Sequence, residues 1–422
     1  MRTSYKLTIH GSRGNYNKYY FSIITKKAIA QMQTIINELL AKGVCIYNPS
    51  SVEIGADVKP ERIRPGVVIH SGCRIFGAET LIEAGAVIGF EGPVTINNCY
   101  VGPKVELGGG YFAEAAFLAG ARAGLGAHVR AGTIMEEQSS IAHTVGLKQT
   151  ILFPFVTLGS LINFCDCFMA GGTSRKNHSE VGSSYIHFNY TPSQHKATPS
   201  LLGDVPKGVM LNQRPIFLGG QGGMVGPCCF SFGVTTAAGI IVRKNEPNTG
   251  RLIFGYGDTQ RTSAPYVEKS DKAKINKLLI KANIIYIANL IALRHWYRYI
   301  RALFIGPDFS AELHQGLCST LEKAITERII RLKDYGKAFT DVPDAEWSAF
   351  EAIFAINDNL ADFRDLRNEF IAKLDNLSIG SQTYLEVITG LDETAVDLGT
   401  SWLQQIVDNV TARALNAFPQ VS

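Results

Sequence analysis

The chain carries little net charge and no long apolar run. These two absences argue against a nucleic-acid-binding protein and against a membrane protein. Its 422 residues have a formal net charge of +4, and only 18% of them are charged. Because this small positive excess is dispersed along the chain, we do not expect nucleic-acid binding. The N-terminal segment MRTSYKLTIHGSRGNYNKYY lacks the apolar core of a signal peptide, and the strongest apolar run, Ile284 to Leu293, is too short to span a bilayer. We therefore predict a cytoplasmic protein without membrane insertion.

The residue spacings of metal and nucleotide sites are also missing. The eight cysteines include Cys165-x-Cys167 and Cys228-Cys229, but no second CxxC or histidine cluster stands at zinc-finger spacing. We expect buried thiols in a reducing cytoplasm and no bound metal. The segment GGQGGMVG lacks both the GK[ST] ending and the following helix of a phosphate-binding loop, so we interpret it as corners between short strands.

The chain does contain a six-residue spacing of apolar side chains, which runs from about Ile54 to Val242. The positions that follow it are Ile63, Ile69, Ile75, Leu81 and Val87, then Val101 and Leu107, then Leu152, Leu158, Phe164 and Ala170, and finally Phe230, Thr236 and Val242. A period of six fits neither an α-helix nor an alternating strand and is typical of the hexapeptide repeat. Each hexad supplies one short strand with one inward side chain, and a following Gly or Ala permits a tight corner. We predict a mainly β fold, a left-handed parallel β-helix of about ten to twelve coils at ~18 residues per coil.

Three regions follow from the change of spacing along the chain. Residues 1–53 form an N-terminal segment that includes one amphipathic helix, residues 54–262 form the β-helix, and residues 263–422 form an α-helical C-terminal domain. We expect the helical domain to pack as a cap and to make no direct contact with a ligand. The repeat is interrupted at Gly108 to Gly126 and at Ser174 to Arg214, where we predict loops at the edge of the solenoid.

Residues 162–242 hold a series of short motifs in a defined order. They are Asn163-Phe164, Asn177-His178, Asn189-Tyr190, Leu202-Gly203-Asp204, Val225-Gly226-Pro227 and Ala237-Ala238-Gly239. The series resembles the acetyltransferase half of the bacterial bifunctional N-acetylglucosamine-1-phosphate uridyltransferase/glucosamine-1-phosphate acetyltransferase family. Upstream, LLAKGVCIYNPSSVEIG is similar to the helix and linker entering that family's β-helix, and Val129-Arg130-Ala131-Gly132 is similar to its sugar-phosphate arginine segment. The resemblance covers roughly residues 36–245 and leaves out the nucleotidyltransferase half, so we do not expect uridyl transfer.

The resemblance implies an N-acetyltransferase with acetyl-CoA as co-substrate, acting on an amino sugar phosphate or a nucleotide-linked amino sugar. An amine attacks a thioester only as the free base, so a histidine that titrates near neutrality suits the role of general base. His178 matches the family's catalytic histidine. The family also implies a homotrimer in which three β-helices pack in parallel with the sites between them.

Further candidate residues follow from the same resemblance. Arg130 and Lys196 match the family's cations that hold the sugar's phosphate, and Asn189 and Tyr190 match residues that contact the sugar or its pocket. The family lysine after Asn-Phe is absent here, and Lys148, or Arg175 with Lys176, are the candidates to supply its charge. The candidates for binding coenzyme A are Gly220 and Ala238 along the pantetheine arm, with Arg243, Lys244 or Arg251 at its phosphates. Solvated positions at the coil edge are the alternative for Arg243 and Lys244, and a turn-shaping role is the alternative for Asn189-Tyr190.

The chain departs from the family near His178 and Asn163 and by an additional segment, SIAHTVGLKQTILFPFVTLGSLI, between Arg130 and Asn163, which leaves other functions open. The family tyrosine after the histidine is replaced by the run from Ser179 to Val181, and the family lysine after Asn-Phe is replaced by the run from Cys165 to Cys167. These changes support a second hypothesis, a non-catalytic sugar-nucleotide-binding protein. A third hypothesis, a metal-dependent hexapeptide protein of the carbonic anhydrase kind, needs three converging histidines. His178, His187 and His195 lie in one loop without coil spacing.

Overall fold

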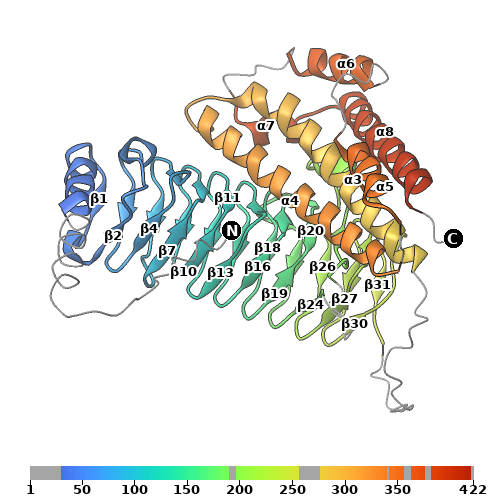
Figure 1. Ribbon diagram of the computed structural model, residues 1–422, viewed down its shortest axis with the longest axis horizontal. Coiled ribbons are helices and arrows are strands. Elements are labelled where there is room, and N and C mark those ends of the chain that lie inside the picture. Colours follow the sequence, from blue (N-terminus) through green and yellow to red (C-terminus); the bar gives the residue numbers. More distant parts are fainter. Residues whose placement is uncertain are drawn as a thin grey trace.

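The computed structural model describes residues 30–189, 196–255, 276–339, 342–355, 363–375 and 382–419, and its centre is a parallel β-solenoid with three long faces (Figure 1). Face A consists of β1 Cys45–Ile46, β3 Val68–Ile69, β6 Val87–Ile88, β9 Glu106–Leu107, β12 Arg122–Ala123, β15 Ser140–Ile141, β18 Thr157–Leu158, β23 Glu180–Val181, β26 Phe217–Leu218, β29 Thr235–Thr236 and β31 Leu252–Ile253. Face B consists of β2 Glu53–Ile54, β4 Arg74–Phe76, β7 Val94–Asn97, β10 Gly110–Ala113, β13 Ala127–Val129, β16 Gly146–Lys148, β19 Asn163–Cys165, β24 Ile186–Phe188, β27 Gly223–Val225 and β30 Ile241–Val242. Face C consists of β5 Leu81–Ile82, β8 Tyr100–Val101, β11 Ala115–Phe117, β14 Thr133–Met135, β17 Ile151–Leu152, β20 Cys167–Met169, β25 Ser200–Leu202 and β28 Cys229–Phe230.

Each coil passes from face A to face B and then to face C, which defines an A–B, a B–C and a C–A corner. Neighbouring coils pair in parallel, so that Ile69 lies beside Ile88 and Ile88 lies beside Leu107. These three side chains have no exposed surface, which places them in the apolar core that the hexads predict. The prediction of a parallel β-helix is confirmed.

The first shift of the inward position occurs near the start of the solenoid. Val87 was expected inside, but it is only half-buried on the outer side of β6, and Ile88 fills the core instead. The change occurs because the step from Ile75 to the next inward residue, Ile82, spans seven positions rather than six, as the pairing of Ile82 with Val101 shows.

The glycine-rich stretch from Gly108 to Gly126 is not a loop, so that prediction was wrong. It forms the regular strands β10, β11 and β12. Its small residues are needed because successive coils lie close together. A Cβ atom on Gly110, for example, would lie 2.1 Å from the carbonyl oxygen of Ala127. The stretch from Ser174 to Arg214 does interrupt the coils in part, with a hairpin of β21 Gly172–Ser174 and β22 Asn177–His178 and a second excursion after β24.

Helices lie at one end and along one side of the solenoid (Figure 1). A helix over 30–41 covers the N-terminal end, where its Ile36 and Leu39 are buried. The other helices are η1 Pro49–Ser51, η2 Pro60–Arg62, α2 Val205–Gly208, α3 Lys277–Tyr299, η3 Arg301–Phe304, α4 Ala311–Lys337, α5 Asp344–Phe354, α6 Arg364–Asp375, α7 Tyr384–Thr389 and α8 Glu393–Ala417. Helix α4 contacts β8, β11 and β14, and α3 packs between α4 and α8. The stretch Lys277–Phe304 is long and apolar enough to cross a membrane, but 72% of its most apolar window is buried inside the protein.

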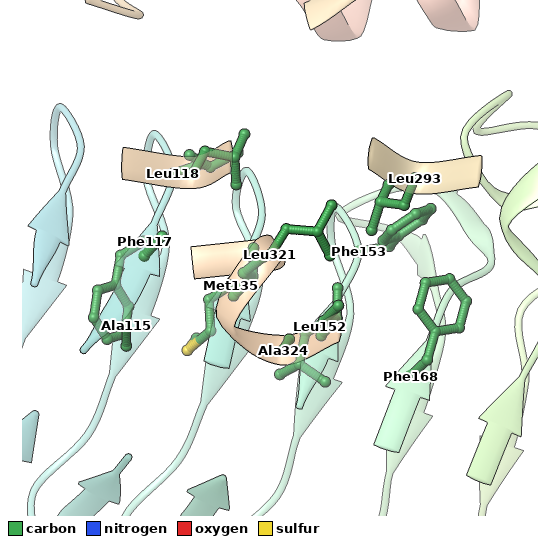
Figure 2. Packing of buried hydrophobic residues seen from close by; sticks show 14 of the residues in the cluster. Ala115, Phe117, Leu118, Met135, Leu152, Phe153, Phe168, Leu293, Leu321 and Ala324 are labelled. Carbon is green, nitrogen blue, oxygen red and sulfur yellow. The ribbon is translucent and has the colours of Figure 1, made fainter. Parts of the chain in front are cut away.

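Face C is therefore buried on both sides, whereas faces A and B have one open side. Every residue of β11 and β14 is buried, while the outward residue of β12 on face A is exposed. Figure 2 shows Leu321 and Ala324 of α4 and Leu293 of α3 beside the side chains of face C. A Cβ atom on Gly316 of α4 would lie 2.1 Å from the ring of Tyr100, so only glycine permits this approach.

Buried polar contacts hold the helices at both edges of face C. At the C–A corner, Arg301 forms an ion pair with Glu137 and lies over the rings of Phe309 and Tyr384, 4.6 and 3.8 Å from their centroids. Next to it, the Tyr297 hydroxyl donates to Glu136 over 2.5 Å. Burial, helped by the charge of Glu137, raises the pKa of Glu136 to about 8. At the B–C corner, Arg328 of α4 pairs with Asp166 over 2.6 Å.

One histidine lies inside the solenoid. His187 of β24 is 2% exposed, and its Nε2 atom lies 2.7 Å from the Ser200 hydroxyl on the face C strand of the same coil. Burial lowers the pKa of His187 to about 4, although the nearby Asp166 carboxylate favours the protonated form. The ring is therefore neutral at pH 7.

We predict that Arg301→Met destabilises the protein by about 3–5 kcal/mol, because it leaves the Glu137 carboxylate buried without its partner. Arg122→Met is the matched control, since Arg122 pairs with Glu106 over 3.1 Å but its side chain is 65% exposed. The control should change stability by less than about 1 kcal/mol. Thermal unfolding followed by circular dichroism measures both, and equal midpoints for the two variants would contradict the prediction.

We also predict that His187 contributes to acid sensitivity. Because its pKa is lowered in the folded state, the unfolded chain binds this proton first as the pH falls below about 6.5, and stability is lost down to pH 4. Between pH 6.5 and 5 the loss should be about 2 kcal/mol. His187→Gln keeps a polar group beside Ser200 but cannot titrate, so its unfolding midpoint should fall less over this range than that of the unchanged protein. Parallel pH profiles would exclude His187 as a source of the acid sensitivity.

Candidate functional site

Two of the predicted cations lie together at the B–C corner. The parallel register places Val129 beside Leu147, and Lys148 beside Cys165, so Arg130, Lys148 and Cys165 follow one another on three successive coils. Arg130 donates to the Cys165 sulfur over 3.6 Å. Arg130 is exposed and Lys148 is half-buried, so both ammonium and guanidinium groups are available to a ligand anion.

Cys165 is a buried thiol rather than a reactive one. Its side chain is 4% exposed, and burial, followed by the charge of Asp166, raises its pKa in spite of Arg130 and Lys148. The residue that replaces the family lysine is therefore part of the packed corner, and it supplies no charge to a ligand.

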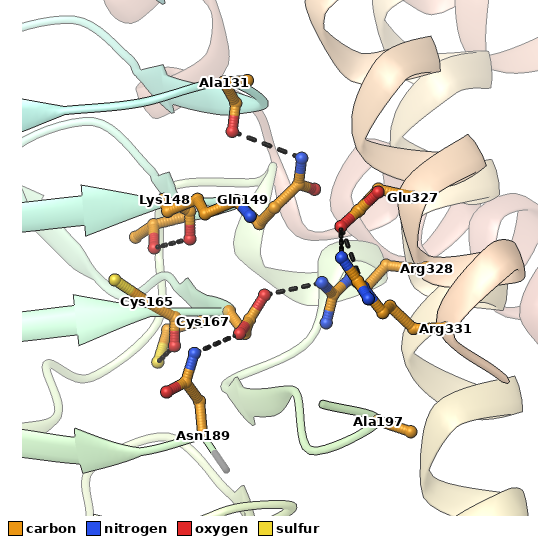
Figure 3. Close-up of polar contacts among 12 residues, drawn as sticks. Ala131, Lys148, Gln149, Cys165, Cys167, Asn189, Ala197, Glu327, Arg328 and Arg331 are labelled. Atoms are coloured by element: carbon orange, nitrogen blue, oxygen red, sulfur yellow. Dashed lines mark hydrogen bonds and ion pairs between the residues drawn. The ribbon is translucent and has the colours of Figure 1, made fainter. Parts of the chain in front are cut away.

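Asn189 lies at the same corner one coil further on. Its Nδ2 atom donates to Asp166 over 2.5 Å, and Figure 3 shows Asn189 and Lys148 on opposite sides of Cys165. Asp166 has a left-handed backbone, with φ of 60°, and its carboxylate also binds Arg328. Tyr190 lies outside the described residues. Lys196 is exposed where the described chain resumes, and the carbonyl of Ala197 beside it accepts from Asn283 of α3 over 2.8 Å.

His178 lies at a different edge, the C–A corner. It ends the second strand of the β21–β22 hairpin, immediately before β23 of face A. Its Nε2 atom lies 3.9 Å from a Glu180 carboxylate oxygen, and its buried Nδ1 atom has no hydrogen-bond partner in the described part of the chain. The side chain is 20% exposed, so a substrate can reach the ring, and Glu180 is placed to attract the charge that proton transfer would create.

Arg175 and Lys176 form the turn of the same hairpin, and both are exposed. One Arg175 nitrogen, Nη1, donates to the carbonyls of Gln138 and Phe155 over 2.9 Å each and to the Thr157 hydroxyl over 3.0 Å. Arg175 therefore connects the hairpin to the preceding coils. These hydrogen bonds explain the presence of an arginine at this position without a role in ligand binding.

The residues that stand where the family has a tyrosine point away from solvent. Val181 has no exposed surface, because it is the inward residue of β23. The buried Ser179 hydroxyl donates to the carbonyl of Ala170 over 2.8 Å and accepts from the amide of Ile216 over 2.9 Å. Neither side chain can contact a substrate bound beside His178.

The predicted coenzyme A residues lie at the A–B corner. Gly220 and Ala238 each follow a face A strand by two positions. The residue before each of them, directly after the face A strand, is also small. Glycine or alanine fills this position in eight successive coils and forms a row of small residues: Gly89, Gly108, Gly124, Ala142, Gly159, Gly182, Gly219 and Ala237. Packing alone requires some of them, since a Cβ atom on Gly219 would lie 2.4 Å from the carbonyl carbon of Ala237.

A groove of about 280 Å³ opens beside the same row over the middle coils of the solenoid, between Phe90, Arg122 and Leu158. Gly220 and Ala238 lie on later coils and do not line it. Arg243 and Lys244 follow β30 at the B–C corner, and both are exposed.

The candidate residues thus occupy three separate edges of one chain. His178 is at the C–A corner, Arg130, Lys148 and Asn189 are at the B–C corner, and Gly220 is at the A–B corner. Face C, which lies between the first two edges, is covered by α3 and α4. The structure places the cations and Asn189 along one corner, on coils that follow one another, but it does not bring His178 to them within one chain.

His178 and His187 do not lie together, as two ligands of one metal ion in a single chain would have to. His187 lies inside the solenoid and His178 at its edge, while His195 is outside the described residues. Within the described ranges, no group of three or more His, Cys, Asp or Glu side chains is placed to hold a metal ion.

Sequence reasoning missed the pair of Asp166 and Arg328. Asp166 was visible as part of the run that replaces the family lysine, but Arg328 stands in an ordinary amphipathic helix far along the chain. Its 3% exposed side chain reaches the candidate corner only through the docking of α4.

No protein-family model matches the chain. It is 26% identical over 226 residues to the bifunctional protein GlmU of Oleidesulfovibrio alaskensis, which covers 53% of this chain and 44% of that protein. The GlmU protein of Trichlorobacter lovleyi is 25% identical over 216 residues, with coverage of 51% and 42%, and that of Staphylococcus haemolyticus is 27% identical over 219 residues, with coverage of 52% and 43%. The match thus spans less than half the length of these curated relatives. The chain is a hexapeptide-repeat β-helix protein with a distant relationship to bifunctional GlmU proteins over about half of its own length.

Proposed function

We propose that the chain is an acyl-CoA-dependent N-acetyltransferase that acts on an amino sugar phosphate or a nucleotide-linked amino sugar. The observation that carries the proposal is the similarity to GlmU proteins over 53% of the chain, joined to a parallel β-solenoid with a half-buried histidine at one edge and a pair of cations at another. Acetyl-CoA is the co-substrate. The eight cysteines are all free, which suits a reducing cytoplasm.

In the proposed reaction, residues at the three corners have different roles: proton transfer, binding of the sugar phosphate and binding of coenzyme A. The amine nitrogen attacks the thioester carbonyl while His178 accepts the amine proton, so that a C–N bond forms and the C–S bond breaks. The proton then passes to the departing thiolate. Arg130, Lys148 and Lys196 hold the phosphate, and Asn189 with Tyr190 orients the sugar. The pantetheine arm lies along the small-residue row beside Gly220 and Ala238 at the A–B corner, and Arg243 and Lys244, at the B–C corner across face B, are the candidates to meet the phosphates.

A trimer follows from the same proposal, because the tasks fall on separate edges of one chain. A site that combines His178 with Arg130 and Gly220 needs edges from neighbouring copies. Faces A and B are open to such packing, and the A–B corner exposes Leu125 and Leu161, which are 47% and 55% accessible. Face C is not open to it, because the helices already cover it.

A non-catalytic sugar-nucleotide-binding protein is the second candidate. It is favoured by Val181, which points into the core where the family has a tyrosine, and by Cys165, which is buried where the family has a lysine. A thermal-shift screen of acyl-CoAs and of UDP- and phosphate-linked sugars separates the two candidates, because a bound ligand raises the unfolding midpoint by mass action. Stabilisation by sugar nucleotides but not by acyl-CoAs would favour the binding protein.

We predict that His178→Ala lowers turnover by roughly 10²–10⁴-fold, which is the usual contribution of a positioned general base. Affinity for coenzyme A should barely change, since the imidazole acts on the amine. Thiol release from acetyl-CoA with glucosamine 1-phosphate measures the rate. His70→Ala is the control, because His70 stacks on Tyr47 at 4.8 Å in the first coils, away from the candidate residues. Equal rates for His178→Ala and the unchanged enzyme would remove His178 from the mechanism.

We predict that the protein in solution has three times the 46.0 kDa mass of one chain. Light scattering coupled to size exclusion, at micromolar concentration, measures this mass directly. Leu161→Glu would place a charge at the exposed A–B corner and should reduce the trimer, whereas Ile330→Glu, at an exposed position of α4, should not. A monomeric unchanged protein would contradict the intersubunit site.

A further inference from the structure

Asp166 joins the helical region to the candidate sugar site. Arg328 of α4 contacts one of its carboxylate oxygens, Oδ1, over 2.6 Å, and Asn189 donates to the other, Oδ2, over 2.5 Å. Figure 3 shows Arg328 and Asn189 reaching this point from opposite sides, the first from the helix and the second from the coil. Both oxygens of Asp166 are therefore engaged, and the three side chains form one continuous chain of contacts.

The carboxylate determines how the Asn189 amide is turned. An ionised carboxylate only accepts hydrogen bonds, so the amide must present its nitrogen to Asp166. Its carbonyl oxygen is then directed away from Asp166 as an acceptor. An asparagine without this contact could present either end, and only the acceptor end recognises a hydroxyl or an N–H group of a ligand.

Stability alone does not explain why an arginine stands at this position. The Arg328 side chain is 3% exposed, and its Nε and Nη1 atoms are buried without a hydrogen-bond partner among the described residues. A buried ion pair is a weak source of stability, because removing both charges from water offsets most of their attraction. The helices are also held at the other edge of face C by Arg301 and Tyr297. The feature that Arg328 adds is the fixed orientation of Asp166.

The surroundings of the pair favour a fixed orientation as well. The Asp166 amide donates to the carbonyl of Lys148 over 2.8 Å, and its own carbonyl accepts from the amide of Ser200 over 3.0 Å. The backbone of Asp166 is thus held between the coil of Lys148 and the next strand of face C. Only the carboxylate can still rotate, and Arg328 occupies the side that faces the helices.

We propose that Arg328 is a positioning residue for the candidate sugar site. It holds the Asp166 carboxylate, which holds Asn189 with its carbonyl oxygen ready to accept a hydrogen bond from a hydroxyl or amine of the sugar. Arg130 and Lys148 lie along the same corner and take the phosphate. The helical region then influences which ligands bind without contacting them. The identity of the ligand rests on the proposed function, whereas the orientation of Asn189 does not.

The test compares Arg328→Met with Arg331→Met on the same helix. Arg331 lies three residues further along α4, pairs with Glu327 over 2.8 Å and is 30% exposed. Thiol release is measured against varied glucosamine 1-phosphate and, separately, against varied acetyl-CoA.

Arg328→Met should raise KM for the sugar by about 10-fold, because one directed hydrogen bond to the sugar is lost. KM for acetyl-CoA should stay within about 2-fold. Arg331→Met should change neither, and Arg328→Lys, which keeps the charge, should recover most of the sugar affinity.

Two kinetic results would overturn the proposal. One is an unchanged KM for the sugar in a folded Arg328→Met protein. The other is an equal loss for both substrates, which indicates a general structural role. If the unchanged protein neither acetylates nor binds glucosamine 1-phosphate, the proposed function is wrong. The positioning role is then tested separately by crystal structures of the unchanged protein and of Arg328→Met. A displaced Asn189 amide supports it, and an amide still bonded to Asp166 overturns it.

Discussion

The double burial of face C is the constraint on which the rest of the structure depends. A solenoid of this kind has three equivalent faces, and here one of them is apolar outside as well as inside, as the fully buried strands β11 and β14 show. Helices α3 and α4 therefore belong to the same hydrophobic core as the coils. Without them, the outer side of face C would be a large exposed apolar surface. The ion pairs of Arg301 and Arg328 mark the two edges of this interface.

The covered face also limits where chemistry can take place. His178 and the cations Arg130 and Lys148 flank face C, so the helices stand between them. Within one chain the helices keep them apart, and for this reason the proposed site is placed between subunits. The same covering brings Arg328 to the B–C corner. A helical region can in this way affect recognition through a buried carboxylate while remaining outside the site.

The fold was predictable from the sequence because each hexad has a local physical cause. An aliphatic residue every six positions has to face a common interior, and Ile69, Leu107 and Leu158 do so with no exposed surface. The prediction failed where packing between coils overrides the local pattern. At Gly110 the absence of a side chain reflects the close approach of Ala127, which no local feature of the sequence shows. Arg130 was within reach of a motif comparison, whereas Lys148 was named only as a substitute for the missing family lysine. The coil pairing then places the two at equivalent positions of successive coils.

The sequence by itself determined the parallel coils, their inward side chains and the helical nature of the C-terminal region, because periodicity acts over a few residues. Only the tertiary structure decided which corner each candidate residue occupies, which face the helices cover, and that Arg328 meets Asp166. The corners depend on pairing between successive coils. The helix contacts join segments more than a hundred residues apart, such as Arg328 and Asp166, and no local spacing encodes them. Three further features could not be predicted from the sequence for the same reason. They are the burial of Val181, the hydrogen bonds of Arg175 to earlier coils and the orientation of Asn189, and each depends on neighbours that only the complete fold supplies.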